Sequence, residues 1–257
     1  MVKRSPRLTI DIVTLFPEMF RGPFNESMIQ KARERGIVSI QVHLLRKYAY
    51  DRHRTCDDKP FGGGPGMVMK PEPLFACVED LKKRAPQAHV VLMSPLGRVF
   101  DQKQAARLAR SKHLIFICGH YEGVDERVRE HLIDEEISIG DFITTGGEVP
   151  CMCVVDSIAR LIPGVVGNEQ SIQEESFQRN LLDFPHYTRP AVFRGLKVPE
   201  VLLSGDHHKV ASWREEQAVT RTLKLRPDLV GGKKIFNEAK RSRNHRKALL
   251  KKGNSTV

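Results

Sequence analysis

The stretch that decides the fold is LIFICGHYEGVDERVREHLIDEEISIGDFITTGGE, residues 114–148. It holds two β-branched apolar runs, 114–118 and 136–139, and each run is followed by a turn that contains glycine. The segment between them, 124–132, has helical periodicity. Strands that alternate with helices are typical of an α/β domain with a largely parallel sheet. Ligands bind beyond the carboxyl ends of such strands, so both turns are candidate binding loops.

The same alternation extends from this stretch toward the N-terminus. Strands are predicted at 8–15, 37–44 and 89–94, and helices at 26–35, 71–84, 102–111 and 149–161. Pro71 suits a first helical position and Gly36 suits a C-terminal cap. The segment SPLG at 94–97 is a third turn after a strand. None of the three turns fits G-x-G-x-x-G, so a Rossmann-type cofactor site is not indicated.

A second, smaller domain is expected after the first 162 residues. Pro163, Gly164 and Gly167 interrupt any continuing helix, and we place a flexible linker at 163–174. The region 175–257 reads as mainly helical. Its main helix is predicted at 207–225, with Asp206 or Ser204 as its N-terminal cap and Arg226-Pro227 as its end.

The bulk composition excludes several classes of protein. The chain has 257 residues, of which 40% are hydrophobic, and no apolar run approaches the roughly 20 residues of a membrane span. The basic N-terminus lacks the apolar stretch of a secretory signal, so a cytoplasmic protein without membrane association is expected. Five scattered cysteines favour neither disulfides nor zinc. Cys77 and Cys118 are predicted to be small core residues.

The net charge of +11 is concentrated at one end of the chain. Residues 233–257 contain nine Lys or Arg and one acid, Glu238, which leaves only +3 for the other 232 residues. A concentrated basic end is typical of a segment that gathers phosphates. A solvated tail would have the same composition, and both interpretations stay open.

A second loop is predicted at 51–67, DRHRTCDDKPFGGGPGM. It lacks the G-K-[ST] ending and the preceding strand of a P-loop. We interpret it as a mobile substrate-binding loop, against the alternative of a plain structural turn. Its candidate phosphate contacts are Arg52, His53, Arg54 and Lys59.

The turn at 119–123 offers side chains as well as backbone. Tyr121 presents a ring face for stacking a base, and Glu122 can accept hydrogen bonds from a guanine edge or a ribose. Asp125 and Glu126 are better explained as acids that stabilise the start of the following helix.

Six sequence motifs, in the same order along the chain, indicate a resemblance to a known family. They are DRHRTCDDKPFGGGPGM at 51–67, SPLGR at 94–98, CGHYEGVDERV at 118–128, SIGDFITTGGE at 138–148, SIARLIPGV at 157–165 and LLDFPHYTRP at 181–190. Together they resemble the bacterial tRNA (guanine-N1)-methyltransferases of the SPOUT class. The similarity runs in order from TLFPEMF at 14–20 to VLLSGDH at 201–207.

The resemblance implies a fold, a cofactor and partners. The expected fold is a trefoil-knotted α/β domain with a parallel sheet, followed by a smaller helical domain that binds tRNA. The expected cofactor is S-adenosyl-L-methionine, and the expected assembly is a homodimer whose active site joins both subunits. The substrate implied is the guanine that follows the anticodon of tRNA on its 3′ side. The resemblance assigns cofactor binding to Pro95, Gly97, Gly119, Tyr121, Glu122, Gly123, Ile139, Gly140, Asp141, Phe142, Ile143, Thr144, Gly146 and Gly147.

The resemblance also assigns a catalytic pair, with one departure. N1 of guanine carries a proton at neutral pH, so a base is needed. The family has an aspartate where this chain has Glu175. Glu175 is therefore the candidate base. Alternatively, Glu174 or Glu169 serves as the base, or the activity is weak or altered. Glu175 could also be an ordinary acid at a helix start. Arg160 matches an arginine that stabilises charge on the guanine oxygen, although it could instead pair with a carboxylate.

Further positions are implied near the substrate. Ser176, Asp183 and Arg189 match such positions, whereas His120 stands where the family usually has arginine. Magnesium dependence is a family property, but no metal-ligand cluster in the sequence identifies a site. Two other hypotheses remain: a SPOUT methyltransferase with another target, and a non-catalytic RNA-binding protein with a vestigial pocket.

Overall fold

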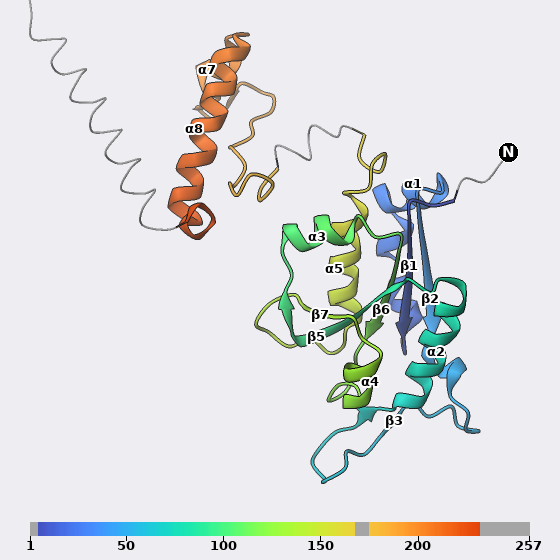
Figure 1. Ribbon diagram of the computed structural model, residues 1–257. Helices are drawn as coiled ribbons and strands as arrows, with labels where there is room; N and C mark the ends of the chain where they lie inside the picture. The colour runs from blue at the N-terminus through green and yellow to red at the C-terminus, as the bar shows by residue number, and fades with distance from the viewer. Residues whose placement is uncertain (1–4, 168–174, 232–257) are drawn as a thin grey trace, which may run out of the picture. The chain divides into compact units, whose positions relative to one another are not determined.

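The computed structural model describes residues 5–167 and 175–231 of the chain, which divides into two compact units (Figure 1). The units are Met1–Glu169 and Gln170–Val257. The basic segment 233–257 and most of the predicted linker lie outside the described residues.

The N-terminal unit is built on five parallel strands in the order β2-β1-β6-β5-β7. Ile10 at the centre faces Ile40 on one side and Leu114 on the other. Because helices cover both faces, the central strands are apolar almost throughout. The strands are β1 (Leu8–Thr14), β2 (Val38–Leu44), β5 (His89–Val99), β6 (His113–Cys118) and β7 (Glu135–Ser138).

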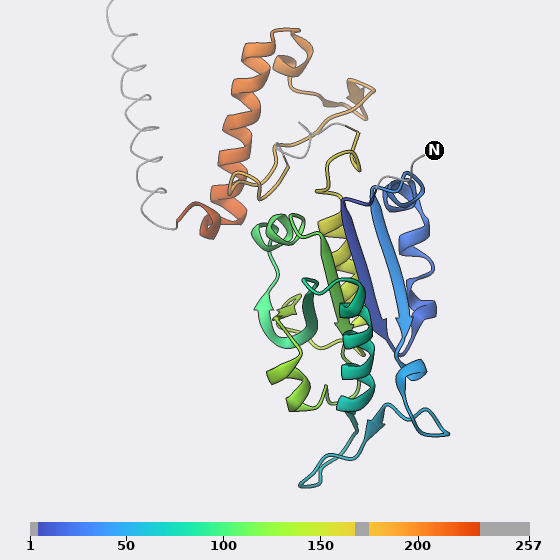
Figure 2. The same ribbon diagram turned by 45° about the vertical axis from the view of Figure 1, so that its right-hand side comes forward.

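Helices pack on the two faces of this sheet (Figure 2). One core contains residues of α1 (Ser27–Glu34), α3 (Gln102–Leu108) and α5 (Glu148–Ala159), and the other contains residues of α2 (Pro71–Arg84) and α4 (Glu126–His131). Short 3₁₀ turns complete the unit at η1 (Pro17–Phe20), η2 (Pro23–Asn25) and η3 (Leu45–Tyr48).

Local sequence signals explain where these helices begin and end. Pro71 is the first residue of α2, as predicted. Gly36 has φ +66° and donates its N–H to the carbonyl of Arg33, so it is the C-terminal cap that was expected. Cys77 and Cys118 are fully buried, also as predicted. Burial raises the pKa of the Cys77 thiol to about 12, which keeps it protonated.

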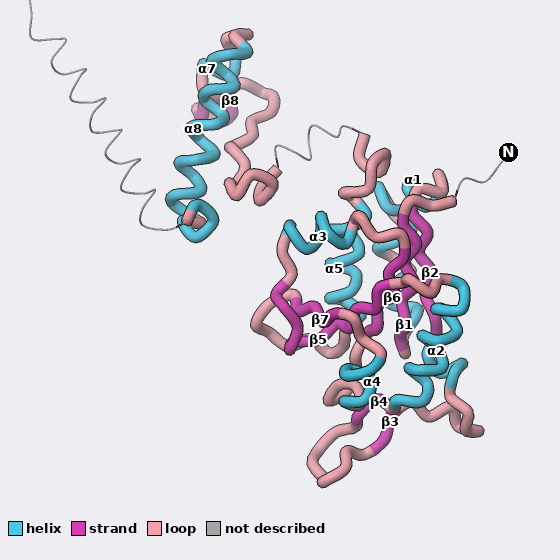
Figure 3. Tube along the Cα trace, viewed as in Figure 1, coloured by secondary structure: helices cyan, strands magenta, loops and turns pink. Residues whose placement is uncertain are grey.

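Residues 51–67 differ from the loop that the sequence predicts. Asp57–Asp58 form β3, which pairs antiparallel with β4 (Val68–Met69). The segment between these strands is the tip of a hairpin that projects from the unit (Figure 3). Two-residue strands carry no readable alternation, so periodicity could not reveal this ladder.

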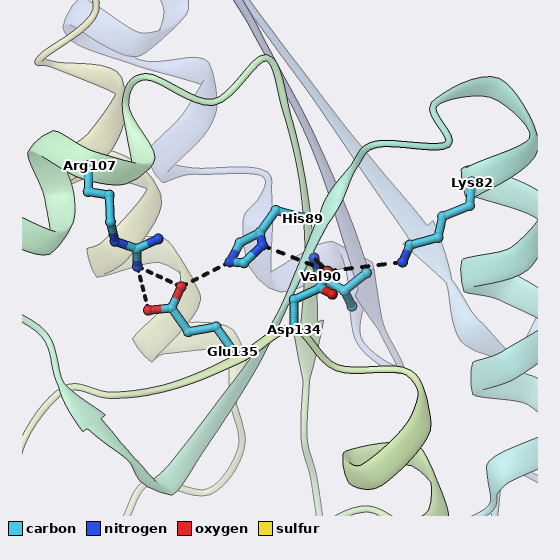
Figure 4. Close-up of polar contacts among 6 residues, drawn as sticks. All are labelled: Lys82, His89, Val90, Arg107, Asp134 and Glu135. Carbon is cyan, nitrogen blue, oxygen red and sulfur yellow. Dashed lines mark hydrogen bonds and ion pairs between the residues drawn. The ribbon is translucent and has the colours of Figure 1, made fainter.

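Charged side chains tie the amino ends of β5 and β7 to two helices (Figure 4). Glu135 accepts hydrogen bonds from Arg107 of α3 at 2.5 and 2.6 Å, and it lies 3.0 Å from Nε2 of His89. Asp134 accepts the N–H of Val90 at 2.8 Å. This network braces the edge of the sheet opposite the carboxyl ends of the strands.

The C-terminal unit is organised around α8 (His207–Leu225), whose bounds match the prediction. Asp206 caps it by accepting the N–H of Lys209 at 3.0 Å. The buried hydroxyl of Thr222 accepts the N–H of Leu182 at 2.8 Å and thereby docks the preceding segment on the helix. The other elements are β8 (Val192–Phe193), β9 (Leu196–Lys197), α7 (Glu200–Leu203) and η4 (Pro227–Val230).

The segment before α7 is less helical than expected. Residues 175–191 contain no helix or strand, and β8 and β9 form a short antiparallel hairpin. Pro185, Pro190 and Pro199 lack the N–H that a continuing helix needs. Across both units, none of the helices in the described residues is long and apolar enough to cross a membrane.

Candidate cofactor site

Three turns, one within β5 and one after each of its neighbours β6 and β7, meet around one cavity of about 610 Å³. The turns are 94–97 within β5, 119–123 after β6 and 139–147 after β7. Twelve of the fourteen expected cofactor residues line it, whereas Gly97 and Asp141 do not. The twelve are Pro95, Gly119, Tyr121, Glu122, Gly123, Ile139, Gly140, Phe142, Ile143, Thr144, Gly146 and Gly147.

The first turn is a bulge inside a strand. β5 pairs with β7 up to Met93 and resumes at Arg98, and both residues face Ile137. The intervening residues loop out toward the cavity. A Cβ on Gly97 would overlap the backbone of Glu136 and Ile137, so this glycine serves the packing of two strands. Gly97 therefore acts on the cavity through the backbone, and Pro95 supplies the lining.

The second turn is strained and tied to the third. Tyr121 has φ +59°, a left-handed conformation that is costly for a residue with a large side chain. The N–H of Gly147 donates to the carbonyl of Gly119 at 2.7 Å. A Cβ on Gly147 would lie 2.8 Å from the Cα of Cys118, which leaves no room for any side chain. Glycine is required here because two backbones touch.

The third turn contributes small polar groups and an apolar rim. The hydroxyl of Ser138 donates to the carbonyl of Gly140 at 3.1 Å, and that of Thr144 donates to the carbonyl of Gly146 at 2.8 Å. Phe142 and Ile143 are exposed. Exposed apolar side chains beside a cavity are typical of a surface that a ligand covers.

Sequence reasoning missed several lining residues. Ser138 and Thr145 lie within quoted motifs but were not singled out, and Glu126 was interpreted only as a helix-start acid. Asp125 does cap α4, since its carboxylate accepts the N–H of Arg127 at 3.0 Å. Arg129 also lines the cavity and pairs with Glu126 at 2.8 Å. Nothing in the sequence of α4 indicated that Glu126 and Arg129 would line a cavity.

The composition of the cavity fits S-adenosyl-L-methionine. A volume of this size is within the range of small-molecule sites, roughly 300–1,000 Å³. Glycines such as Gly119 and Gly140 let a ligand approach the backbone closely, and the lining also includes apolar Ile139. The carboxylate of Glu122 provides negative charge that would favour a sulfonium cation, whereas that of Glu126 is paired with Arg129.

A buried polar group lies behind the second turn. Glu148, only 1% exposed at the start of α5, accepts the Thr14 hydroxyl at 2.7 Å. Its other carboxylate oxygen is 3.9 Å from Nδ1 of His120, a buried atom without a hydrogen-bond partner. The ring of His120 also packs 4.9 Å from that of Phe16. The partly buried His120 therefore packs against Glu148 and Phe16, at the position where the resemblance led us to expect arginine.

The hairpin of residues 51–67 is joined to the same turn. Met69 of β4 donates its N–H to Gly123 at 2.9 Å and accepts the N–H of Asp125 at 3.0 Å, while Glu122 donates its N–H to Met67 at 3.0 Å. A side chain on Gly66 would overlap that of Glu122. The turn that follows β6 is thus bridged to β4 and extends the β3–β4 pairing.

The hairpin and the turn that precedes it carry exposed basic side chains, three of them before β3 and one, Lys59, after it. Arg52, His53, Arg54 and Lys59 are all exposed. Within the described residues, none of these side chains pairs with a carboxylate. The carboxylate of Asp51 accepts the N–H groups of His53 and Thr55 and so fixes the turn. The cations are available for phosphates.

Comparison with known proteins decides the family. The sequence matches the family described as tRNA (Guanine-1)-methyltransferase TrmD over residues 8–232. The chain belongs to the TrmD family. It is 54% identical over 233 residues to the tRNA (guanine-N(1)-)-methyltransferase of Carboxydothermus hydrogenoformans, with 91% of each chain covered. The enzyme of the same name from Bacillus subtilis is 54% identical, with 87% of this chain and 92% of that one covered.

Two residues of this TrmD-family chain, Arg160 and Glu175, are expected to act on the substrate. Arg160 is partly buried at the C-terminal end of α5, in the N-terminal unit. Glu175 is partly buried in the C-terminal unit. The start of α5 adjoins the cofactor cavity through Gly147 and Pro150. The 12 residues of α5 span about 18 Å, so Arg160 lies at the end of the helix remote from that cavity.

The remaining expected substrate residues of this TrmD-family chain lie in the C-terminal unit. Ser176 and Asp183 are brought together, because the Ser176 hydroxyl accepts the N–H of Asp183 at 2.9 Å. The Asp183 carboxylate is 2.7 Å from Nε2 of His186. Arg189 is exposed and lines a separate cavity of the same unit.

Proposed function

We propose that this chain transfers a methyl group from S-adenosyl-L-methionine to N1 of the guanine that follows the anticodon of tRNA on its 3′ side, giving N1-methylguanosine. The observation that carries the proposal is the backbone-lined cavity at the carboxyl ends of β5, β6 and β7 in a chain of the TrmD family. Relatives named tRNA (guanine-N(1)-)-methyltransferase supply the reaction.

The proposed chemistry uses one base and one cation. The N1 proton of guanine passes to the carboxylate of Glu175, and the N1 lone pair then forms a bond to the methyl carbon as the carbon–sulfur bond breaks. Bound S-adenosyl-L-methionine supplies an electrophilic methyl group on a sulfonium. Arg160 stabilises the negative charge that develops on the guanine oxygen as the proton leaves. Glutamate reaches one methylene further than the family aspartate and performs the same proton transfer.

We propose that the chain acts as a homodimer, and the position of Arg160 supports this. If the guanidinium acts at the methyl group, the length of α5 separates it from the cavity of its own subunit by about 18 Å. A second copy of the chain removes that separation by presenting its own Arg160 and Glu175 to the cavity. The substrate partner is tRNA, whose phosphates would meet Arg52, Arg54 and Lys59.

Magnesium is assigned to no residue. The part of the chain that the structure describes contains no group of three or more His, Cys, Asp or Glu side chains that could hold a metal ion. The proposed steps use the protein's own carboxylate and guanidinium.

The test is methyl transfer to an unmodified tRNA transcript, followed by nucleoside analysis of the product. We expect N1-methylguanosine from the wild type and a loss of about 10²–10⁴ in kcat for Glu175→Gln, because the base is removed while the side-chain volume is kept. Glu174→Gln is the matched control and should retain activity. Full activity in Glu175→Gln with loss in Glu174→Gln would move the base to that neighbour.

Two outcomes, one of this assay and one of binding measurements, would overturn the proposal itself. A different methylated nucleoside would make the chain a methyltransferase with another target. Absence of S-adenosyl-L-methionine binding in calorimetry, together with retained tRNA binding, would make it a non-catalytic RNA-binding protein.

A further inference from the structure

The C-terminal unit contains a second cavity, of about 400 Å³, that the chemistry above does not use. It lies between the segment 184–191, α7 and one face of α8, all within a single unit. Neither Glu175 nor Arg160 lines it. The residues that matter for its chemistry are Phe184, His186, Tyr187, Arg189 and Arg214.

The cavity carries positive charge that no acid neutralises. Within the described residues, neither Arg189 nor Arg214 forms an ion pair with a carboxylate. By contrast, Arg179 of the same unit pairs with Glu215 at 3.0 Å. The guanidinium of Arg214 is held over the Phe184 ring at 4.8 Å, which orders it without consuming its charge. A fixed, unpaired guanidinium in a concave site is suited to a phosphate.

Ring faces accompany these cations. Tyr187 is 50% exposed, and its ring lies 6.4 Å from that of Trp213. The rings of Phe184 and His186 are 4.6 Å apart, and Asp183 fixes the imidazole at 2.7 Å. Proteins that bind unpaired RNA combine aromatic faces for the bases with cations for the backbone.

We propose that this cavity binds one unstacked nucleotide of the substrate RNA, with its base against Tyr187 and its phosphate between Arg189 and Arg214. The volume suits a single nucleotide rather than a duplex. Because the proposed acid–base residues lie outside the cavity, this nucleotide is distinct from the guanine that is methylated. The inference rests on the proposed function, since it takes tRNA as the substrate.

The chain provides its own reporter for a binding test. Trp213 is the only tryptophan of the sequence and lies beside Tyr187. Titration of the full-length protein with unmodified tRNA transcript should change the tryptophan emission. Arg214→Gln should weaken tRNA binding about tenfold and raise KM for tRNA, because a charge-assisted phosphate contact is lost. S-adenosyl-L-methionine affinity and kcat at saturating tRNA should stay at the wild-type values.

A matched control has the same ring contact outside the cavity. The guanidinium of Arg194 lies 5.3 Å over the Phe193 ring beside the exposed β8–β9 turn. Arg194→Gln should bind tRNA within about twofold of the wild type, since it removes the same charge from a surface position. If Arg214→Gln fails to fold, Arg189→Gln tests the cavity without touching the Phe184 ring. Tyr187→Phe should preserve binding and Tyr187→Ala should weaken it.

The outcomes separate this inference from the proposed function. Equal tRNA affinities for Arg214→Gln and Arg194→Gln would overturn the nucleotide site, even if methylation proceeds. A change of subunit association in Arg214→Gln, measured by sedimentation, would show that a second copy of the chain fills the cavity, and would also overturn it. Loss of tRNA affinity in a protein that methylates nothing would support the site and reject the reaction.

Discussion

The two cavities of this chain are lined by different kinds of residue. The cavity of the N-terminal unit has five glycines in its lining, and at Gly147 a single added carbon would collide with a neighbouring strand. The cavity of the C-terminal unit is walled by large side chains such as Tyr187 and Arg214. Backbone walls are fixed by the sheet that supports them, whereas side-chain walls can change rotamer. The first cavity should therefore tolerate substitution much less than the second.

The largest effect is expected at Gly147. Gly147→Ala places a Cβ 2.8 Å from the Cα of Cys118, and neither backbone can move without disturbing the sheet. Overpacking of this kind costs about 1–3 kcal/mol, so the affinity for S-adenosyl-L-methionine should fall about tenfold or more in calorimetry. Gly22→Ala is the control, because nothing lies within 4 Å of its added carbon. Equal affinity in both variants would remove the contrast between the cavities.

The next effect concerns Glu148, a buried side chain behind the turn that follows β6. Glu148→Ala leaves the Thr14 hydroxyl without its acceptor and creates a void beside His120. The free energy of unfolding should fall by about 1–3 kcal/mol in denaturant titration. Glu18→Ala removes an exposed ion pair with Arg21 and should change the free energy of unfolding by less than about 1 kcal/mol. A loss at Glu148 no larger than at Glu18 would show that this turn needs no support from Glu148.

The smallest effect is expected at the opposite edge of the sheet and depends on pH. Burial raises the pKa of Glu135, but hydrogen bonds from Arg107 and His89 outweigh it and hold the pKa below its ordinary value of 4.5. Because the folded pKa is the lower one, this stabilisation is complete above pH 4.5 and is lost as the pH falls through the folded value. Glu135→Gln should flatten the fall of unfolding free energy below pH 4.5. An unchanged slope would assign acid sensitivity to other groups.

The sequence predicted the backbone cavity better than the side-chain one, and for a physical reason. Strands buried on both faces can be recognised in the sequence as apolar runs. Glycines that follow them mark turns where backbones approach closely. Twelve of fourteen expected residues accordingly line one cavity. A trefoil knot, in contrast, is expected only from the family resemblance, because no periodicity distinguishes a threaded chain from an open one.

Contacts between distant residues were beyond prediction. Thr14 and Glu148 are 134 positions apart, and the sequence presents the latter as an ordinary acid at a helix start. The cavity of the C-terminal unit joins 184–191 to α7 and α8, and no spacing rule relates these segments. Residues 175–191 were expected to be more helical, and only the prolines gave a warning.

Because β4 pairs with residues 122–125, we expect the hairpin and the turn that follows β6 to move together. Met69 uses both of its backbone hydrogen-bonding groups on that turn, so a displacement of Gly123 carries the base of the hairpin with it. A ligand that holds one end in place restricts the other. If RNA binds the basic residues of 51–59 as proposed, thermodynamic reciprocity requires that RNA and the cofactor change each other's affinity through this ladder by the same factor.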